Sequence, residues 1–334
     1  MTAPLPAGFL ASESQSFTVV GCTPDGAEVL AADTAGRLRH WDRASGTPLS
    51  DWLPVHDRTI WAAAVTPDGR EFVTTGSDGT VRRTRRADNT PAAEPFEVVG
   101  DPLADWVRAL ALTADGAEAV TATQTGVVGR WNLAQGTSAG PPLTGHRGAV
   151  RALVLVADDQ EIVTAGEDGT VRRWDRSSSA PLGAPLDAGS GTVLALAVTP
   201  DGAEVVTGGF DGSVRRFERL TGAPVGAPMT GHGKPVHGVA LTRDGAEIVS
   251  AGSDGTVRRW DRLSGNGLAA PFVGHVGSVW ALALSPDGTE IVTGGFDGSV
   301  RRWDRQTGLP PAPARAGTRT VGVSRVEIHG RTPF

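Results

Sequence analysis

The sequence predicts an all-β fold, a seven-bladed β-propeller of four-stranded antiparallel blades, on three observations. A glycine stands five residues before a strand-ending aromatic slot seven times along the 334-residue chain. The slots are 43 residues apart, except for one interval of 47 residues. Each unit alternates apolar and polar residues in short segments that are separated by Asp-Gly turns. Strand-like repeats with a period in the forties are typical of propeller blades.

The seven units divide the chain evenly. The aromatic slots hold Trp41, Thr84, Trp131, Trp174, Phe217, Trp260 and Trp303, and the glycines are Gly36, Gly79, Gly126, Gly169, Gly212, Gly255 and Gly298. Because each unit buries a face only against its neighbours, we expect one domain over 1–334. The expected blade cores are 17–53, 60–99, 107–144, 150–187, 193–230, 236–273 and 279–315, with a ring-closing strand in 1–12 and a tail over 316–334.

Residues 237–274 illustrate the elements of one unit in order. The segments 239–242, 247–251 and 256–260 alternate as strands do, and tight Asp-Gly turns join them. In these turns a proline presets the backbone where it occurs, and glycine supplies the positive φ. A fourth, weaker strand is expected over 268–272.

Ring closure can come from either terminus. The N-terminal segment 3–10 resembles the outer-strand pattern at 180–186, which favours it as the outer strand of the seventh blade. The segment 309–315 competes for the same place, and 320–328 alternates like a further strand. Both termini cannot fill one slot, and we favour the N-terminal segment.

Composition limits the classes of partner. Hydrophobic residues make up 39% of the chain and charged residues 20%, as in a compact β protein. The net charge of -6 gives no general attraction for nucleic acid, and no apolar run is long enough for membrane insertion. The single cysteine, Cys22, excludes a disulfide within one chain and is expected to be a buried, inert thiol. No leader is recognised, so a cytoplasmic location is expected.

Gly-His, Asp-Gly and Trp-Asp pairs recur at fixed distances, and in this the chain resembles the WD-repeat family over nearly its whole length. In that family a His, a Ser or Thr, an Asp and a Trp form a buried hydrogen-bond chain in each blade. The resemblance implies three complete structural tetrads here: His146, Thr164, Asp168 and Trp174; His232, Ser250, Asp254 and Trp260; His275, Thr293, Asp297 and Trp303.

The other four blades depart from the tetrad pattern. The second has Thr84 in the aromatic slot, and the fifth has Phe217 there with Gly189 at the His position. The first and third place Ala35 and Thr125 at the Asp position. We expect these blades to depend more on packing, and local opening to concentrate in blades two and three, which also hold the insertion.

A basic residue precedes every aromatic slot, where the WD-repeat pattern is usually aliphatic. These residues are His40, Arg83, Arg130, Arg173, Arg216, Arg259 and Arg302, and a glutamate stands thirteen residues before each slot at Glu28, Glu71, Glu118, Glu161, Glu204, Glu247 and Glu290. Strand parity places each glutamate and its basic residue on one face of adjacent strands. The sequence therefore predicts a structural ring of seven Glu to basic-residue pairs between the blades.

The residues do not indicate catalysis. Asp254, His232 and Ser250 have the side chains of a hydrolase triad, but the arrangement repeats in other blades and is expected to be shielded by its Trp. No His, Cys or carboxylate cluster has metal-ligand spacing, and the Gly-rich turns lack the helix of a phosphate site. We expect no enzyme activity, no cofactor and no metal.

Two positions vary from blade to blade and are expected to lie near one rim of the central channel. One opens the first strand of each blade, and the other precedes the tetrad Asp position. Their aromatic and arginine content is typical of interface anchors. The expected partner-binding residues are Trp61, Trp106, Arg108, Arg151, Glu167, Phe210, His237, Trp280 and Phe296. The alternative is that the aromatic residues only plug the channel mouth.

The sequence therefore predicts a non-catalytic scaffold or sensor that binds a protein partner on this rim. Near-uniform blades rich in Arg and poor in Lys also resemble bacterial WD-repeat proteins. Such a resemblance implies an alternative role as regulatory subunit of a kinase, a signalling ATPase or a caspase-like protease. A propeller enzyme or a small-molecule binder is the third alternative.

Overall fold

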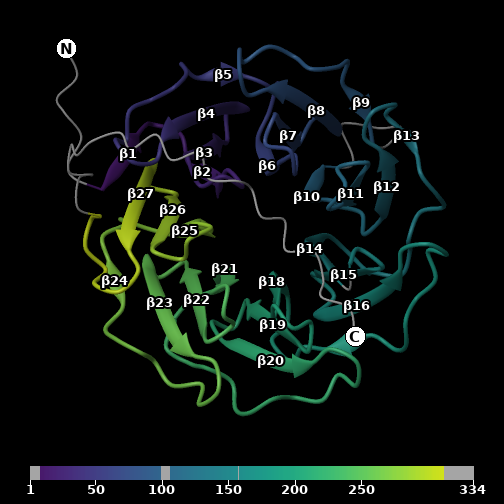
Figure 1. Ribbon diagram of the computed structural model, residues 1–334. Coiled ribbons are helices and arrows are strands. Elements are labelled where there is room, and N and C mark those ends of the chain that lie inside the picture. Colours follow the sequence, from purple (N-terminus) through teal and green to yellow (C-terminus); the bar gives the residue numbers. More distant parts are fainter. Residues whose placement is uncertain (1–7, 99–105, 157, 312–334) are drawn as a thin grey trace, which may run out of the picture.

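Seven antiparallel sheets form a closed ring in the computed structural model, which describes residues 8–98, 106–156 and 158–311 (Figure 1). All regular secondary structure in these ranges is β. The seven-bladed, all-β architecture predicted from the repeat is therefore confirmed. In the first six blades the chain runs outward from the channel, strand by strand, and then crosses to the inner strand of the next blade.

Three strands of each blade are long enough to pair over most of their length. The inner strands are β2 (Phe17–Cys22), β6 (Ile60–Val65), β10 (Val107–Leu112), β14 (Val150–Val156), β18 (Val193–Val198), β21 (Val236–Leu241) and β25 (Val279–Leu284). The second strands are β3 (Glu28–Asp33), β7 (Glu71–Gly76), β11 (Glu118–Thr123), β15 (Glu161–Gly166), β19 (Glu204–Gly209), β22 (Glu247–Gly252) and β26 (Glu290–Gly295). The third strands are β4 (Arg37–Asp42), β8 (Thr80–Arg85), β12 (Val128–Asn132), β16 (Thr170–Asp175), β20 (Val214–Glu218), β23 (Thr256–Asp261) and β27 (Ser299–Asp304).

The outer strands are short. They are β5 (Leu53–Pro54), β9 (Phe96–Glu97), β13 (Thr137–Ser138), β17 (Leu186–Asp187), β24 (Phe272–Val273) and, in the seventh blade, β1 (Phe9–Ser12). In the fifth blade an isolated bridge between Val214 and Met229 takes the place of an outer strand. The strand expected over 268–272 is thus shorter and later, at Phe272–Val273, because the Pro-containing segment before it pairs only through single bridges.

Glycine is required at the repeated position before the third strand. All seven of these glycines have positive φ, for example +79° at Gly36. A Cβ on Gly36 would lie 2.1 Å from the carbonyl oxygen of His56, in the loop that enters the next blade. The repeat therefore marks the point where each turn meets the incoming loop.

The core is divided into seven clusters, and each joins two neighbouring blades. The cluster between blades seven and one contains Phe17, Trp41, Val292 and Val300, all of which are nearly or fully buried. The other six clusters repeat this arrangement around the ring. Each blade is thus stabilised from both sides, as expected for a closed propeller.

The N-terminal segment completes the seventh blade. Strand β1 pairs antiparallel with β27, and the amide of Arg302 donates to the carbonyl of Gly8 at 2.7 Å. Leu10 and Ala11 of β1 are buried in the cluster between blades seven and one. Of the competing C-terminal segments, 320–328 lies outside the described residues, as do residues 1–7 and most of 309–315.

The predicted Glu to basic-residue contacts form in all seven blades, but each lies within one blade. Arg173 Nε donates to Glu161 at 2.7 Å, and His40 Nδ1 lies 2.8 Å from Glu28. The remaining pairs are Arg83 with Glu71, Arg130 with Glu118, Arg216 with Glu204, Arg259 with Glu247 and Arg302 with Glu290. This confirms the predicted pairing on neighbouring strands, and Glu204, for example, also faces the next blade, as expected for a ring between the blades.

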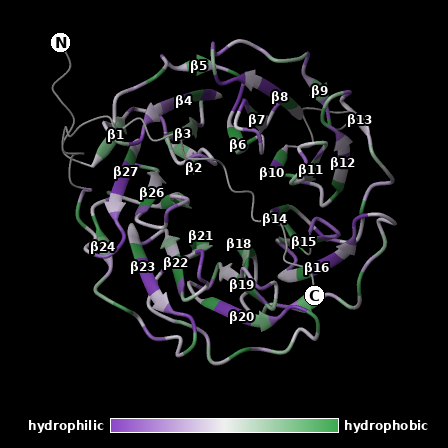
Figure 2. Cartoon of the chain, in the orientation of Figure 1, coloured by the Kyte–Doolittle hydropathy of each residue, from purple (hydrophilic) through white to green (hydrophobic). Residues whose placement is uncertain are grey.

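A second arginine, two residues after the aromatic slot, makes the bridge between blades. Arg262 of blade six reaches Glu204 of blade five at 2.6 Å, so that Glu204 contacts arginines of two blades. The other bridges join Arg43 to Glu290, Arg86 to Glu28, Arg176 to Glu118, Arg219 to Glu161 and Arg305 to Glu247. We call the alternating contacts within and between blades the Glu–Arg ladder. Its first arginine is the one before the aromatic slot, and Figure 2 shows the hydrophilic segments of β16 and β23 that carry this residue.

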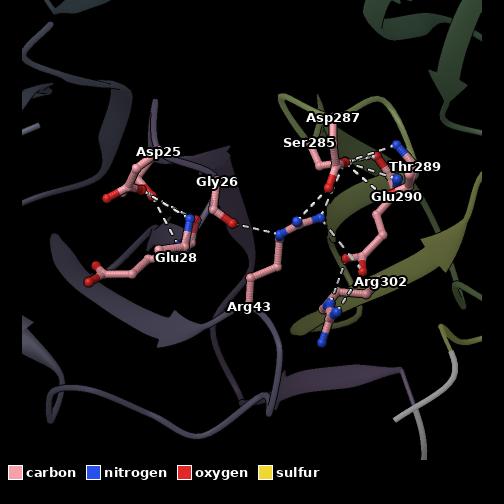
Figure 3. A network of polar contacts seen from close by, with 11 residues as sticks. Asp25, Gly26, Glu28, Arg43, Ser285, Asp287, Thr289, Glu290 and Arg302 are labelled. Carbon is pink, nitrogen blue, oxygen red and sulfur yellow. Dashed lines mark hydrogen bonds and ion pairs between the residues drawn. The ribbon is translucent and has the colours of Figure 1, made fainter. Parts of the chain in front are cut away.

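One seam of the ladder differs from the other six. In blade three the position of the second arginine holds Leu133, whose carbonyl accepts a hydrogen bond from Arg83 at 3.0 Å. Within the described ranges, Glu71 therefore pairs with Arg83 alone. Figure 3 shows the complete arrangement at the seam between blades seven and one, where Arg43 reaches across to Asp287 at 2.6 Å.

Candidate functional site

The central channel is lined at one end by the variable residue of each inner strand. It encloses a cavity of about 480 Å³. All seven residues predicted to open the first strands line it: Thr18, Trp61, Arg108, Arg151, Leu194, His237 and Trp280. The structure thus gathers in one cavity residues that are up to 262 positions apart in the sequence.

A β-bulge at the start of every inner strand places these side chains. In blade six, Val236 pairs with Gly252 and Gly238 with Ala251, so that His237 is the extra residue. The same register shift occurs at the corresponding position of the other six blades. A bulge leaves its extra residue out of the ladder and redirects its side chain. The bulged residue is therefore available to face the channel.

Five of the seven bulged residues contact the residue sixteen positions later, at the second variable position. Trp61 Nε1 donates to Ser77 at 2.7 Å, and His237 Nε2 lies 2.7 Å from the hydroxyl of Ser253. Arg108 Nε donates to Gln124 at 2.7 Å, Arg151 pairs with Glu167, and the rings of Trp280 and Phe296 meet edge to face at 5.4 Å. The sequence predicted both positions on one rim, but not this pairing.

Two tryptophans and an arginine from blades two and three lie together. The rings of Trp61 and Trp106 stack with centroids 6.2 Å apart. The guanidinium carbon of Arg108 lies 3.9 Å from the Trp61 centroid and 4.7 Å from that of Trp106. Cations at these distances are attracted by the faces of aromatic rings. Trp106, which directly precedes β10, thus joins the residues of the channel mouth.

The charges at the mouth influence one another. Burial, with the nearby positive charge of Arg151, lowers the pKa of Arg108 to about 10. Burial opposes ionisation of Glu167, but the hydrogen bond and charge of Arg151, the amide of Ala149 and the charge of Arg108 together outweigh it and lower the pKa of Glu167. Burial and Arg151 also lower the pKa of His237. At neutral pH the mouth therefore carries two guanidinium groups, one carboxylate and a neutral imidazole.

The opposite side of the mouth is apolar and exposed. Phe210 and Phe296 are 62% and 60% exposed, and Val276, in the loop before β25, is 79% exposed. Phe210 lies in blade five and Phe296 in blade seven, so the two rings are not adjacent. Large apolar side chains exposed beside a cavity are a feature of binding surfaces.

The three complete tetrads form the expected hydrogen-bond chains. Trp174 Nε1 donates to Thr164 Oγ1 at 2.9 Å, and Thr164 Oγ1 lies 2.8 Å from His146 Nε2. His146 Nδ1 lies 3.0 Å from the carboxylate of Asp168. The other two tetrads, His232, Ser250, Asp254 and Trp260 and His275, Thr293, Asp297 and Trp303, have the same contacts.

Burial keeps these side chains out of contact with any substrate. Thr164, Ser250 and Thr293 are fully buried, so no substrate can reach their hydroxyl groups. Burial lowers the pKa of both His146 and His232, which favours the neutral imidazole. A neutral ring with its proton on Nδ1 donates to the Asp and accepts from the hydroxyl, so that one tautomer satisfies every contact.

The sequence model of the WD domain, G-beta repeat, matches five segments of the chain. They are residues 46–82, 140–175, 183–218, 224–261 and 268–304, together more than half of its length. The chain belongs to the WD-repeat family. None of the curated proteins compared with it matches. WD-repeat propellers commonly mediate protein–protein interactions and are generally non-catalytic.

The WD-repeat tetrads of blades two and five are incomplete in different ways. In blade two, His56 Nε2 still lies 2.9 Å from Thr74 Oγ1 and Nδ1 lies 2.9 Å from Asp78, although Thr84 replaces the Trp. In blade five the hydroxyl of Thr207 is buried, and no residue of the described ranges forms a hydrogen bond with it. Phe217 has no N–H to donate, and Gly189 has no imidazole to accept.

Blades one and three compensate for the missing Asp in a way that the sequence analysis overlooked. Buried Asp33 accepts from the amides of Ala35 and Arg37 at 2.9 and 3.0 Å, as a tetrad Asp does. In blade three, Thr123 Oγ1 accepts from the amide of Val127 at 3.2 Å. The other five blades hold glycine at this position. A polar residue at two of seven positions that otherwise hold glycine was the sequence signal that could have indicated this replacement.

His and Gly depend on each other at these positions. A Cβ on Gly252 would lie 2.8 Å from Nδ1 of His232, so the imidazole and a side chain cannot occupy the same space. Blade one has Glu13 at the His position, which leaves room for Asp33. We expected this blade to depend more on packing. Its turn is instead also held by the hydrogen bonds of Asp33.

Other chemistry has little support in the described ranges. No three His, Cys, Asp or Glu side chains there are grouped as ligands for a metal ion. Cys22 is half-buried, and burial raises the pKa of its thiol to about 11, which disfavours the reactive thiolate. No helix of sufficient length and apolarity to cross a bilayer occurs in the part of the chain that the structure describes.

Proposed function

We propose that this WD-repeat propeller is a non-catalytic scaffold that binds a protein partner at the channel mouth. The supporting observation is the β-bulge of each inner strand, which directs seven different side chains into one cavity. The frame repeats from blade to blade, whereas these residues and their neighbours sixteen positions later vary. Variation confined to one face of a uniform frame supports a binding surface.

The chemistry of the mouth fits a protein partner. Aromatic and arginine side chains dominate the hot spots of protein interfaces, and the mouth contains Trp61, Trp280, Arg108 and Arg151. The exposed rings of Phe210 and Phe296 extend the apolar surface beyond the cavity. The alternative role of these rings as a plug would leave them packed, whereas both are largely exposed.

Site-specific photocrosslinking tests the proposal. A benzophenone side chain introduced at Phe296 should crosslink a partner protein, identified by mass spectrometry, that binds the purified propeller again after separate expression. The same group at Leu263, which is 78% exposed at the opposite end of the blades, is the control. Phe210→Ser with Phe296→Ser should weaken rebinding at least about tenfold with little change in thermal midpoint.

Two results would contradict the proposal. One is equal crosslinking of the partner from Leu263 and Phe296. The other is unchanged rebinding by a variant in which Trp61, Arg151, Phe210 and Phe296 are all replaced. Either result would move the interaction away from the channel mouth.

A further inference from the structure

We propose that Trp61, Trp106 and Arg108, here named the Arg108 seat, bind the carboxylate of an Asp or Glu side chain in an acidic segment of the protein partner. This inference rests on the proposed function and deepens it by specifying what the partner presents. The seat lies where the inner ends of blades two and three meet, at β6 and β10 (Figure 1).

Arg108 has donors to spare. Its Nε donates to the neutral amide of Gln124, and no other hydrogen bond or ion pair of Arg108 forms with the described residues. The two terminal nitrogens of its guanidinium therefore keep their donors for an incoming group. Arg151, in the next blade, differs because Glu167 already neutralises it. Two parallel N–H groups suit a carboxylate, which can accept from both at once.

The aromatic walls of the seat favour an anion in contact with Arg108. Trp61 and Trp106 hold the guanidinium at 3.9 and 4.7 Å from their centroids and cover part of it from water. Attraction between opposite charges strengthens as water is excluded. Arg151 repels Arg108, and Glu167, which pairs directly with Arg151, offsets this repulsion only in part, so that the pKa of Arg108 stays lowered. An anionic partner group would relieve this repulsion.

The charge count selects a carboxylate rather than a phosphate. Arg108 and Arg151 contribute two positive charges and Glu167 one negative charge, while His237 is neutral at neutral pH. A carboxylate, with one negative charge, balances the remaining charge. A doubly charged phosphate would leave an excess negative charge close to Glu167. The chain's own segment 312–334 has the wrong sign, since it contains four arginines and one acidic residue.

Three matched peptides test this inference on the full-length protein. Each is a fluorescein-labelled Gly-Ser peptide with two central Glu, two central Gln or two central phosphoserine residues, and binding is followed by fluorescence anisotropy at low salt. The Glu peptide should bind at least about tenfold more tightly than the Gln peptide. Arg108→Gln should abolish that preference. Arg243→Gln, an equal charge change in an exposed turn at the far end of β22, should preserve it.

Charge reversal gives a second test that misfolding cannot imitate. Arg108→Glu should lose the Glu peptide and bind a matched peptide with two central Lys residues better than the wild-type protein does. The inference is overturned if the wild-type protein does not distinguish Glu from Gln, if it prefers phosphoserine, or if Arg243→Gln weakens binding as much as Arg108→Gln. In those cases the crosslinks from Phe296 would still decide the proposed function separately.

Discussion

The hydroxyl of Thr207 has no hydrogen-bond partner among the residues that the structure describes. It is buried in blade five, where the residues that would complete a tetrad are Phe217 and Gly189. A buried hydroxyl without a partner destabilises the folded state. Thr164 occupies the same place in blade four with both partners present. The two threonines therefore form a natural comparison within one molecule.

We predict opposite effects for the same substitution at these two sites. Thr207→Val should leave the free energy of unfolding unchanged or raise it by up to about 1 kcal/mol, because it removes an unsatisfied group without changing the shape. Thr164→Val should lower it by about 2 to 4 kcal/mol, because Trp174 Nε1 and His146 Nε2 lose their partner. Urea denaturation of both variants checks this, and equal losses would contradict it.

Sequence reasoning worked well for residues that obey the repeat and less well for residues that replace it. The resemblance to the WD-repeat family identified the complete tetrads, because each member stands at the family's spacing. Asp33 was overlooked because it substitutes for a member two positions away, through space that opens when the His is absent. The bulges were overlooked because an unpaired residue leaves no trace in an apolar–polar alternation.

At the scale of the elements, the Glu–Arg ladder joins strands and then blades. Glu161 contacts Arg173 of its own blade and Arg219 of the next, whereas Glu71 contacts Arg83 alone within the described residues. Both glutamates are largely buried, so their pairing matters more than that of surface ion pairs. The contribution of each glutamate to the free energy of unfolding should therefore depend on how many arginines it contacts.

We predict that Glu161→Gln lowers the free energy of unfolding by about 3 kcal/mol and Glu71→Gln by about 1 kcal/mol. The difference arises because the first change leaves two arginines without their carboxylate and the second leaves one. Denaturation at neutral pH measures both values. A larger loss from Glu71→Gln would show that the bridge between blades contributes little.

The stability difference between the wild-type protein and Glu161→Gln should depend on pH. Burial opposes ionisation of Glu161, but hydrogen bonds from Arg173 and Arg219 outweigh it and lower the pKa of its carboxyl below the ordinary value of 4.5. Its contribution to stability is therefore present above pH 4.5 and is lost as the pH falls through the lowered pKa. The stability difference between wild type and Glu161→Gln should shrink in acid. A constant difference down to about pH 3 would contradict this linkage.

Strand parity was sufficient to predict the first arginine of the ladder but not the second. Parity places Arg259 and Glu247 on one face of adjacent strands, as the structure shows. The second arginine, such as Arg262, lies in a turn beyond the strand, where alternation no longer indicates direction. Its contact with Glu204 depends on how two blades sit beside each other. Such contacts follow from the tertiary arrangement rather than from local pattern.

For the whole molecule, closure depends on a short strand from the start of the chain. Strand β1 covers the edge of β27, and Leu10 is 5% exposed in the cluster that joins blades seven and one. Among the sheets that the structure describes, this one alone joins residues from opposite ends of the sequence. The cost of opening the ring there should be governed by the contacts of β1.

We predict that Leu10→Ala lowers the free energy of unfolding by about 2 to 4 kcal/mol, because it leaves a cavity beneath β1. Hydrogen exchange should accelerate at the amide of Arg302, which donates to Gly8, more than at amides of β20 on the far side of the ring. Leu263→Ala, at an exposed position, should change neither quantity. Uniform acceleration around the ring would show that closure is not a local event.

The overall architecture was predictable because it follows from the residues that repeat. The surface of the channel mouth depends on residues that differ between blades and was less predictable. Seven repeats, at intervals of 43 residues with one of 47, indicated a closed ring before any strand was placed. The positions of Trp61 and Trp280 on one rim also followed from the repeat. The approach of Trp106 to Trp61 did not, because the corresponding position of the other six blades holds no aromatic residue, so no repeated pattern indicated where its ring lies.

Because of the bulge at the start of each inner strand, every repeat contributes its own side chain to the channel mouth. Because a bulged residue and its neighbour sixteen positions later belong to one repeat, a duplicated or transplanted repeat carries its own pair with it. Recombination between repeats would then change the side chains at the mouth while the scaffold stays intact. The same property offers protein engineers fourteen positions to randomise, in seven pairs, for selecting new binders.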